Sequence, residues 1–411
     1  MNIDNDNNAN DNFDTFLPIV EPSSHFIEND LSQYHTETWE DFNIKTDLLR
    51  GIYNMGFEKP SPIQQKAIKP IIMKRDIIGQ AQSGSGKTGT FTIGVLERID
   101  ISIKATQAIL LAPTHELANQ IANVVKTIGN VMNGLVVQLL IGGTSIYEDI
   151  HLLKNNTPHV VVGCPGRIFD TIKRQQLNMS NIRIFVLDEA DEILSSGFKD
   201  QIYNIFQYLP STIQVALFSA TMPTEILQLT NKFMQNPVKI IMKNEDLNLE
   251  CIQQFYIALQ NDTAKYDMLK TLFEYFNVSQ CIIYANSVQR VVDVYNAMIN
   301  DGFSVCCIHS NMNKQEREDV FSNFKKGSAR VLISSNITSR GIDVQQVSTV
   351  INYDIPQCVH NYLHRIGRSG RWGRKGLAIN FVTRRDICYM RNIETHYKST
   401  IQELPNNYKF T

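Results

Sequence analysis

Two segments of this chain carry residue types that could bind and cleave a nucleoside triphosphate. The loop AQSGSGKT spans Ala81–Thr88, and the acidic segment Asp188–Asp191 follows the apolar run Ile182–Leu187. Small residues let backbone N–H groups close around phosphate oxygens, and a helix pattern after the loop adds a favourable dipole. The pair predicts an NTPase. The loop residues assigned to the nucleotide are Ala81, Gln82, Ser83, Gly84, Ser85, Gly86, Lys87 and Thr88.

Individual side chains in these two segments suit separate chemical roles. Lys87 can reach the outer phosphates, and the hydroxyl of Thr88 can ligate Mg²⁺. Asp188 can hold the same Mg²⁺, while Glu189 can orient and deprotonate the attacking water. The simpler alternatives are a Gly/Ser-rich surface turn and a solvated acidic turn, but the strand–loop–helix context favours the NTPase.

Two further segments could connect this site to the rest of the protein. Ser219 and Thr221 end an apolar run, and their hydroxyls could bond Asp191, although a capping or turn role fits them equally well. The segment His364–Arg371 has arginines at glycine spacing, which suits a spread-out negative charge. If two domains close, Arg368 and Arg371 can serve as arginine fingers, whereas the alternative is a basic surface patch.

The order of apolar runs predicts the elements that must position these residues. Short runs at 108–112, 159–163, 182–187 and 214–219 alternate with helix-like stretches, and the rhythm restarts with 280–285, 304–309, 330–335 and 347–353. Such alternation indicates α/β domains with parallel sheets buried on both faces. We expect an Asn-rich disordered tail at 1–30, a nucleotide-binding domain at 31–241, a linker at 242–250 and a second domain at 251–411.

Composition excludes several other classes of protein. No apolar run approaches the length that spans a bilayer, and the first residues lack the pattern of a secretory signal. The seven cysteines form no CxxC pair, so free thiols are expected rather than zinc or disulfides. The net charge of −2 leaves no basic footprint, and RNA would therefore need a local groove.

Taken in order, these motifs resemble those of the DEAD-box RNA helicases, in particular the translation-initiation branch and its nuclear relatives. The resemblance covers about residues 39–405 and includes long stretches at 48–68, 197–206, 340–356 and 364–383. It implies two tandem RecA-like domains, each a mostly parallel sheet with helices on both faces, joined by a short linker.

The resemblance also assigns residues to ATP, to domain coupling and to RNA. It implies that Phe42 stacks on adenine, that Gln64 reads the adenine edge and that Asp343 bonds the ribose. The coupling residues would be Asp191, Ser219, Thr221 and His364. The RNA path would comprise Pro113, Thr114, His115, Gly143, Cys164, Gly166, Arg167, Asn286, Ser287, Arg317 and Ser334.

The departures from the family pattern concern RNA more than ATP. His115 stands where the family has an arginine, Cys164 where it has a threonine, and Lys314 where it has a glutamine. The family's final aspartate in TTD is Asn336, and the stretch Asn286–Arg290 has fewer basic residues than its counterpart. We therefore expect a weakened or re-tuned RNA path beside an intact ATP site, with neutral drift as the alternative.

The predicted function is an ATP-dependent RNA helicase that uses ATP and Mg²⁺, has RNA-stimulated ATPase activity and unwinds local duplexes at mRNA 5′ regions. Expected partners are single-stranded or short duplex RNA and a translation-initiation scaffold protein. The chain is expected to be monomeric and cytoplasmic and not to associate with membranes. The alternatives are an ATP-gated RNA clamp or scaffold, a nuclear RNA-processing helicase, and a DNA helicase with the same core.

Overall fold

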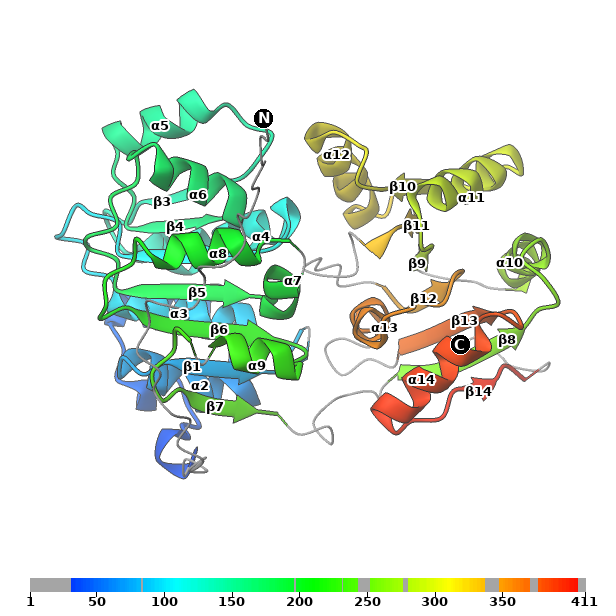
Figure 1. The fold of residues 1–411 in the computed structure, drawn as a ribbon, viewed down its shortest axis with the longest axis horizontal. Helices are drawn as coiled ribbons and strands as arrows, with labels where there is room; N and C mark the ends of the chain where they lie inside the picture. Colours follow the sequence, from blue (N-terminus) through cyan, green and yellow to red (C-terminus); the bar gives the residue numbers. More distant parts are fainter. Residues whose placement is uncertain are drawn as a thin grey trace, which may run out of the picture. The chain divides into compact units, whose positions relative to one another are not determined.

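The computed structural model describes residues 31–82, 84–195, 197–230, 232–242, 252–275, 280–336, 347–369 and 376–405. The tail predicted at 1–30 and positions 243–250 of the predicted linker lie outside these ranges. Within them the elements alternate between strand and helix in two successive sets (Figure 1).

The first set of elements forms a parallel sheet whose neighbouring strands are far apart in sequence. Its order is β3-β4-β2-β5-β6-β1-β7. The strands are β1 (Ile77–Gln80), β2 (Ala108–Leu111), β3 (Val137–Leu140), β4 (Val160–Gly163), β5 (Ile184–Asp188), β6 (Gln214–Ser219) and β7 (Val238–Ile241).

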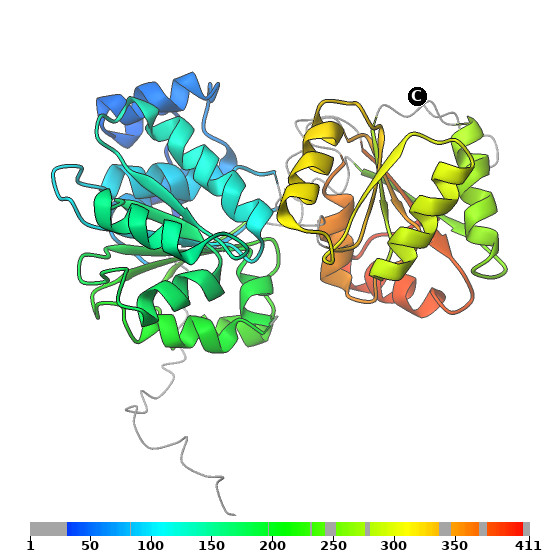
Figure 2. The same cartoon turned by 90° about the horizontal axis from the view of Figure 1, so that it is seen from above.

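Helices cover both faces of this sheet (Figure 1, Figure 2). One face packs against α1 (Thr46–Asn54), α2 (Pro62–Ile72), α3 (Lys87–Arg98) and α4 (His115–Ile128). The other packs against α5 (Ile146–Asn155), α6 (Pro165–Lys173), α7 (Ala190–Ser195), α8 (Lys199–Phe206) and α9 (Thr224–Thr230). Short 3₁₀ helices span Leu31–Tyr34, Glu40–Phe42 and Gly129–Val131.

Strand side chains alternate between these two cores. In β2, Ala108 and Leu110 belong to one core while Ile109 and Leu111 belong to the other, and all four are fully buried. A strand buried on both faces needs an unbroken apolar run, which is the pattern seen in the sequence.

The second set repeats the arrangement. Its sheet has the order β10-β11-β9-β12-β13-β8-β14, so each strand has a counterpart at the same place in the first sheet. The strands are β8 (Ile252–Ala258), β9 (Cys281–Tyr284), β10 (Val305–Ile308), β11 (Val331–Ser334), β12 (Thr349–Asn352), β13 (Gly376–Val382) and β14 (Gln402–Glu403). The helices are α10 (Ala264–Tyr275), α11 (Val288–Asn300), α12 (Lys314–Lys325), α13 (Val359–Ile366) and α14 (Ile387–Tyr397).

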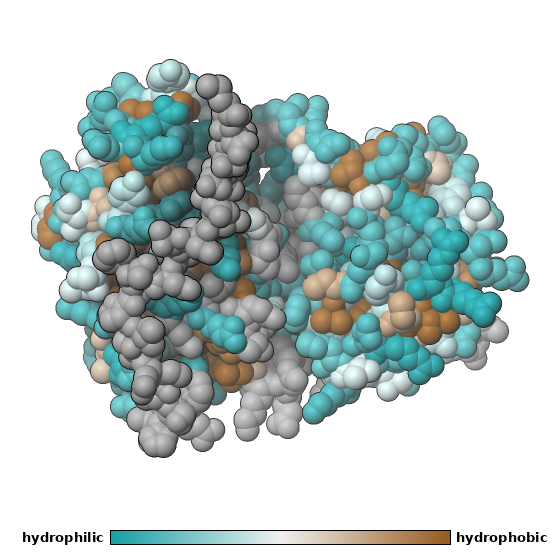
Figure 3. Space-filling view, viewed as in Figure 1, coloured by the Kyte–Doolittle hydropathy of each residue, from teal (hydrophilic) through white to brown (hydrophobic). Residues whose placement is uncertain are grey.

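The predicted fold class is confirmed. All the described strand pairs are parallel, and each of the eight predicted apolar runs coincides with one strand, although β5 continues one residue beyond its run to Asp188. Among the described residues, no helix is long and apolar enough to cross a membrane. On the face shown in Figure 3, hydrophobic residues form small separate groups within a mostly hydrophilic surface.

Candidate functional site

The predicted phosphate loop joins β1 to α3 at the carboxyl edge of the first sheet. Its first residue, Ala81, donates its N–H to the carbonyl of Ser219 at 3.1 Å, which holds the loop against the end of β6. Gly84 and Gly86 have φ values of +84° and +102°, a left-handed conformation that favours glycine. Gly86 is also the N-cap of α3, so the turn delivers the chain directly to a helix N-terminus.

Lys87, the first residue of α3, is enclosed by the site. The side chain is only 6% exposed, and Nζ donates to the carbonyl of Ala81 at 2.8 Å. Nζ also lies 3.8 Å from Oε1 of Glu189. The structure therefore brings together the two segments that the sequence separates, and it places the ammonium between the loop and the acidic motif.

The acidic motif begins at the last residue of β5. Asp188 and Glu189 are both buried, and Oδ1 of Asp188 accepts the N–H of Glu189 at 3.0 Å. Glu189 has a φ of +48°, an uncommon conformation for a residue with a Cβ that turns the chain sharply after the strand. Burial, and then the Glu189 carboxylate, raise the pKa of Asp188 well above its usual range, while Lys87 opposes this effect. A divalent cation would offset the same accumulation of negative charge.

Asp191 is the second residue of α7 and lies in a buried polar cluster. Its Oδ2 accepts the hydroxyl of Thr221 at 2.5 Å and lies 3.3 Å from Nε2 of His364. The Oγ of Ser219 accepts the N–H of Thr221 at 3.2 Å, a turn contact of the kind considered for these hydroxyls, and a bond from Ser219 to Asp191 stays a prediction. Carboxylate and imidazole atoms of Glu189, Asp191 and His364 all lie within 4.8 Å of one another. A function for this cluster in coupling the domains stays a prediction.

Gln64 reaches the phosphate loop from α2. Its Oε1 accepts the N–H of Ser61 at 2.7 Å, which completes a capping box, and its Nε2 donates to the carbonyl of Gly86 at 3.4 Å. Ser61 in turn donates its hydroxyl to the carbonyl of Ser85 at 2.7 Å. An amide can make four hydrogen bonds, so adenine recognition by Gln64 is compatible with these contacts. Phe42 is 6% exposed and packs against Trp39, and its stacking on adenine stays a prediction.

Two predicted residues of the second domain are described: His364 lies on α13, and Arg368 lies two residues after it. Arg368 is 3% exposed and donates from Nε to the carbonyl of His364 at 3.2 Å. Arg365 lies in the interior of the domain, because its guanidinium is completely buried. Four predicted positions lie outside what the structure describes: Ser83, Asp343, Arg371 and the side chain of Lys314.

The predicted RNA residues of the first domain follow β2, β3 and β4, which are neighbours at one side of the sheet. Thr114 caps α4 by accepting the N–H of Leu117 at 3.3 Å. Cys164 precedes α6, and burial raises the pKa of its thiol to about 12, with the Glu116 charge adding to the effect. Pro113 and Gly143 lie in the loops after β2 and β3, while His115 is the first residue of α4 and Gly166 the second residue of α6. The strand order thus separates this group from the phosphate-loop and acidic motifs, which follow β1, β5 and β6.

Arg167 is tied to the loop that follows β3. It forms an ion pair with the buried carboxylate of Asp149, and it donates to the hydroxyl and the carbonyl of Thr144 at 3.1 and 2.7 Å. The side chain of Arg167 therefore links the first turn of α6 to α5 and to the loop between β3 and α5. Neither Asp149 nor Thr144 was indicated by the sequence, since they lie 18 and 23 residues from Arg167.

The second domain places its predicted RNA residues after β9 and β10 and at the end of β11, the corresponding side of its sheet. Asn286 and Ser287 both have structural partners: Asn286 donates to the carbonyl of Ile355 at 2.9 Å, and Ser287 accepts the N–H of Arg290 at 3.2 Å. Ser334 donates its hydroxyl to the neighbouring carbonyl at position 335. Their contact with RNA stays a prediction.

Arg317 forms an ion pair that sequence reasoning missed. It donates from a terminal nitrogen to Oε1 of Glu116 at 2.8 Å, across 201 residues of sequence, and both side chains are mostly buried. Glu116 adjoins His115 in the predicted RNA path. No local pattern could have indicated this pair, whereas the Ser61–Gln64 capping box has a recognisable S-x-x-Q signature.

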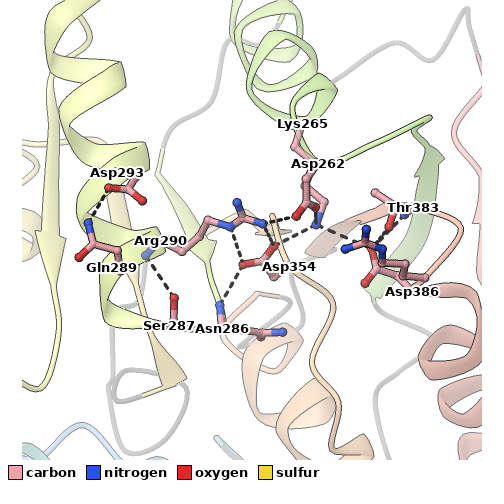
Figure 4. A pocket seen from close by; sticks show the side chains of 11 residues that line it. Asp262, Lys265, Asn286, Ser287, Gln289, Arg290, Asp293, Asp354, Thr383 and Asp386 are labelled. Carbon is pink, nitrogen blue, oxygen red and sulfur yellow. Dashed lines mark hydrogen bonds and ion pairs between the residues drawn. The ribbon is translucent and has the colours of Figure 1, made fainter.

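A second polar pocket lies in the C-terminal domain (Figure 4). Lys265 lies at the start of the helix after β8, as Lys87 does after β1, and Asp354 lies two residues past β12, close to the position of Asp188 at the end of β5. Lys265 contacts Asp354 at 2.9 Å and Asp262 at 3.1 Å, while Arg290 contacts Asp262 at 2.7 Å. Carboxylates of the chain itself neutralise both cations, so this pocket is an internal ion-pair network.

Comparison with known proteins identifies the family. The DEAD/DEAH box helicase profile matches residues 61–229, and the helicase conserved C-terminal domain profile matches residues 264–373. The chain is 50% identical over 369 residues to ATP-dependent RNA helicase eIF4A of Saccharomyces cerevisiae, covering 90% of this chain and 93% of that protein. It is 48% identical over 394 residues to eukaryotic initiation factor 4A of Caenorhabditis elegans, covering 96% and 97%. The chain belongs to the DEAD/DEAH box helicase family.

Solved structures agree with this assignment. S. cerevisiae Dbp5 bound to RNA and ADP BeF3 superposes with a TM-score of 0.84 at 33% identity, covering 90% of this chain and 96% of that one. Mss116p bound to ssRNA and AMP-PNP gives 0.80 at 26% identity, covering 90% and 79%.

Proposed function

We propose that this protein is an ATP-dependent RNA helicase of translation initiation, which hydrolyses ATP and locally separates RNA strands. The observation that carries the proposal is the buried contact of Lys87 with Glu189, made where a glycine-rich loop and an acidic motif meet at one sheet edge. Membership of the helicase family and 50% identity to eIF4A relatives support RNA as the polymer and initiation as the process.

Each side chain of the site has a role that its position supports. The loop N–H groups and Lys87 bind the phosphates, and Thr88 with Asp188 would hold Mg²⁺. This donor set fits the ion, because a hydroxyl and a carboxylate are oxygen ligands that Mg²⁺ prefers. Bound Mg²⁺ supplies charge stabilisation to the phosphate oxygens. Glu189 accepts a proton from the attacking water.

Residues around this centre select ATP and complete the site. Gln64 pairs with the adenine edge, and Phe42 stacks on the base. Arg368 and Arg371 stabilise charge that develops on the transferred phosphoryl group, and Asp343 binds the ribose. Thr221 and His364 both contact Asp191, and through His364 the ATP site is coupled to the second domain.

RNA is proposed to lie along the loops after β2, β3 and β4 and along those after β9, β10 and β11. The predicted RNA residues of both domains lie in these loops, in the first turns of the helices that follow them or at the end of β11, on the side of each sheet away from the phosphate loop or its counterpart. Contacts to phosphates and 2′-hydroxyls would make binding largely independent of sequence. We also propose that a translation-initiation scaffold protein binds the chain, which acts as a monomer in the cytoplasm.

The test of this function uses the unmodified chain. ATP hydrolysis is expected to rise several-fold on adding single-stranded RNA, and ATP is expected to drive separation of a short RNA duplex. Stimulation by DNA instead of RNA would contradict the RNA assignment. Stable ATP-dependent retention of RNA without repeated turnover would favour a clamp over a helicase.

His115→Arg is expected to strengthen RNA binding. His115 begins α4, and its Nε2 lies 3.1 Å from the position that a Cβ on Gly142 would occupy. A permanent cation here would add one phosphate contact, so the slope of log affinity against log salt should steepen by about 0.7 for a single strand. Fluorescence anisotropy with a labelled oligonucleotide at several salt concentrations measures both quantities.

The matched control is Lys126→Arg, an exposed cation on the same helix α4. It alters the side chain without adding charge, and its RNA affinity should equal that of the parent. An unchanged slope for His115→Arg would mean that position 115 does not face a phosphate.

A further inference from the structure

A second candidate site lies at the amino edge of the first sheet, in a pocket of about 530 Å³. Three cations line it: Lys74 after α2, Arg98 at the last position of α3, and Arg183 just before β5. Glu97 is the one acidic residue among the described residues that line the pocket. None of these residues belongs to the predicted ATP or RNA sites.

The two arginines are held together by neutral acceptors. Arg98 donates to the carbonyl of Arg183 at 3.4 Å, and Arg183 donates back to the carbonyl of Arg98 at 3.5 Å. Arg98 also donates to Oε1 of Gln214. Burial, and then the charge of Arg183, lower the pKa of Arg98 to about 10. Within the described part of the chain, neither arginine nor Lys74 forms an ion pair.

The nearby acidic groups have other partners. Oε2 of Glu97 accepts the N–H of Lys45 at 2.8 Å, and Oδ1 of Asp100 accepts the N–H and hydroxyl of Ser102 at 3.0 and 2.6 Å. Four cations accompany these two carboxylates. Three of them line the pocket, and the fourth is Lys45, which lies close to Arg183. The surplus of two positive charges favours an anion.

The end of α3 would by itself repel an anion, since carbonyl oxygens give a helix C-terminus a partial negative charge. The ammonium of Lys45 offsets this partial negative charge. Its Nζ donates to the carbonyls of Leu96, Glu97 and Ile99 at 3.3, 2.5 and 2.7 Å. The helix end is thereby capped by a cation, and the two arginines keep donors for a ligand.

The ion-pair network of the C-terminal domain provides a contrast. There Lys265 and Arg290 are neutralised by carboxylates of the chain, whereas Arg98 and Arg183 are not. Like charges held side by side and partly buried are costly unless an anion joins them.

We propose that this pocket binds a small phosphorylated molecule, with a phosphoryl group between Arg98 and Arg183 and with Lys74 at the rim. Planar guanidinium groups suit such an anion because each can donate two parallel hydrogen bonds. Ile72 and Ile182 form apolar walls, and the volume is that of a small-molecule site.

The ligand would not compete with ATP. Arg98 and Lys87 are the two ends of α3, about 17 Å apart at the rise of an α-helix. Arg183 and Asp188 likewise flank β5 at opposite ends. The pocket and the ATP site therefore lie at opposite edges of the same sheet.

The test uses inorganic pyrophosphate and glycerol 3-phosphate in calorimetric titrations of the full chain carrying Lys87→Ala, which disables the phosphate loop. At least one of the two compounds is expected to bind, and the tighter one indicates an inorganic or an organic ligand. Adding Arg183→Gln should weaken binding at least tenfold, whereas adding Arg174→Gln, an exposed arginine on the surface of the same domain, should not.

Thermal unfolding separates loss of the site from loss of the fold. Arg183→Gln should unfold at or above the parent temperature, because it removes a repelling charge, but it should no longer gain stability from the ligand. The proposal is overturned if neither compound binds or if Arg183→Gln binds as the parent does. Loss of single-stranded RNA affinity in Arg183→Gln without any effect on the two phosphates would overturn it in favour of a nucleic-acid contact.

Discussion

Glu189→Gln is expected to lower RNA-stimulated ATP hydrolysis by about 10²–10⁴-fold, the usual contribution of a positioned general base. Glu189 is 4% exposed and turns toward Lys87 at 3.8 Å. Glutamine keeps the shape of the side chain and its capacity for hydrogen bonds, but it cannot accept the proton of a water molecule. The rate at saturating ATP and RNA measures the effect.

Nucleotide binding should survive this change. The Glu189 carboxylate is one of the groups that raise the pKa of Asp188, so its removal lets Asp188 ionise more readily. An ionised Asp188 is the form that would hold Mg²⁺. Retained affinity for ATP, with a lost rate, therefore separates the proton acceptor from the binding groups.

Glu148→Gln is the matched control for this experiment, because it makes the same chemical change on an exposed side chain of α5. Its rate should equal that of the parent. A Glu189→Gln rate within tenfold of the parent would show that another group activates the water.

The candidate ATP site could be predicted from sequence because its signals are local. The loop 81–88 and the acidic motif each stand directly after an apolar run, and parallel strands bring their carboxyl ends to one edge of a sheet. The contact of Lys87 with Glu189 follows from that topology. Their separation in sequence is irrelevant once β1 and β5 are known to belong to the same sheet.

The burial and the partners of Arg365 could not be predicted from the sequence. In the sequence it is one of several arginines in a glycine-rich segment, and it suggests binding of an anion. In the structure it is completely buried, with partners that lie 11, 13, 29 and 79 residues away. Those partners depend on the order of β9, β11 and β12 in the second sheet, which no short motif encodes.

Arg365→Met is expected to lower the free energy of unfolding of the C-terminal domain by about 3–5 kcal/mol. The guanidinium donates to Asn286 at 2.7 Å, to Asn352 at 3.2 Å and to the carbonyl of Asp354 at 2.7 Å. It donates twice to Oδ1 of Asn336, at 2.8 and 2.6 Å. Methionine has a similar length but would remove the donor from the buried acceptors Asn352 and the carbonyl of Asp354. Urea unfolding, followed by hydrogen exchange at the amides of β12, measures the loss.

The same cluster predicts a stabilising change. Every side-chain acceptor of Arg365 is a neutral amide, and burial lowers the pKa of its guanidinium to about 10. The carboxylate of Asp354 is already engaged by Lys265 and Arg290. Because one oxygen of Asn336 already accepts two N–H groups, Asn336→Asp would place a carboxylate in an existing hydrogen-bond geometry. The variant should gain about 1 kcal/mol, the difference between a charged and a neutral hydrogen bond.

Arg365→Met and Asn336→Asp alter two side chains that contact each other, and they are expected to change the free energy of unfolding in opposite directions, which makes the pair a sharp test. Loss of stability in both would mean that attraction between a carboxylate at position 336 and Arg365 does not stabilise the fold. Exposed Arg174→Met, which removes a guanidinium from the surface, should change the free energy of unfolding by less than about 1 kcal/mol. A comparable loss there would show that the cost of Arg365→Met does not come from burial. Arg365 could then no longer be regarded as the residue that holds together the ends of β9, β11 and β12.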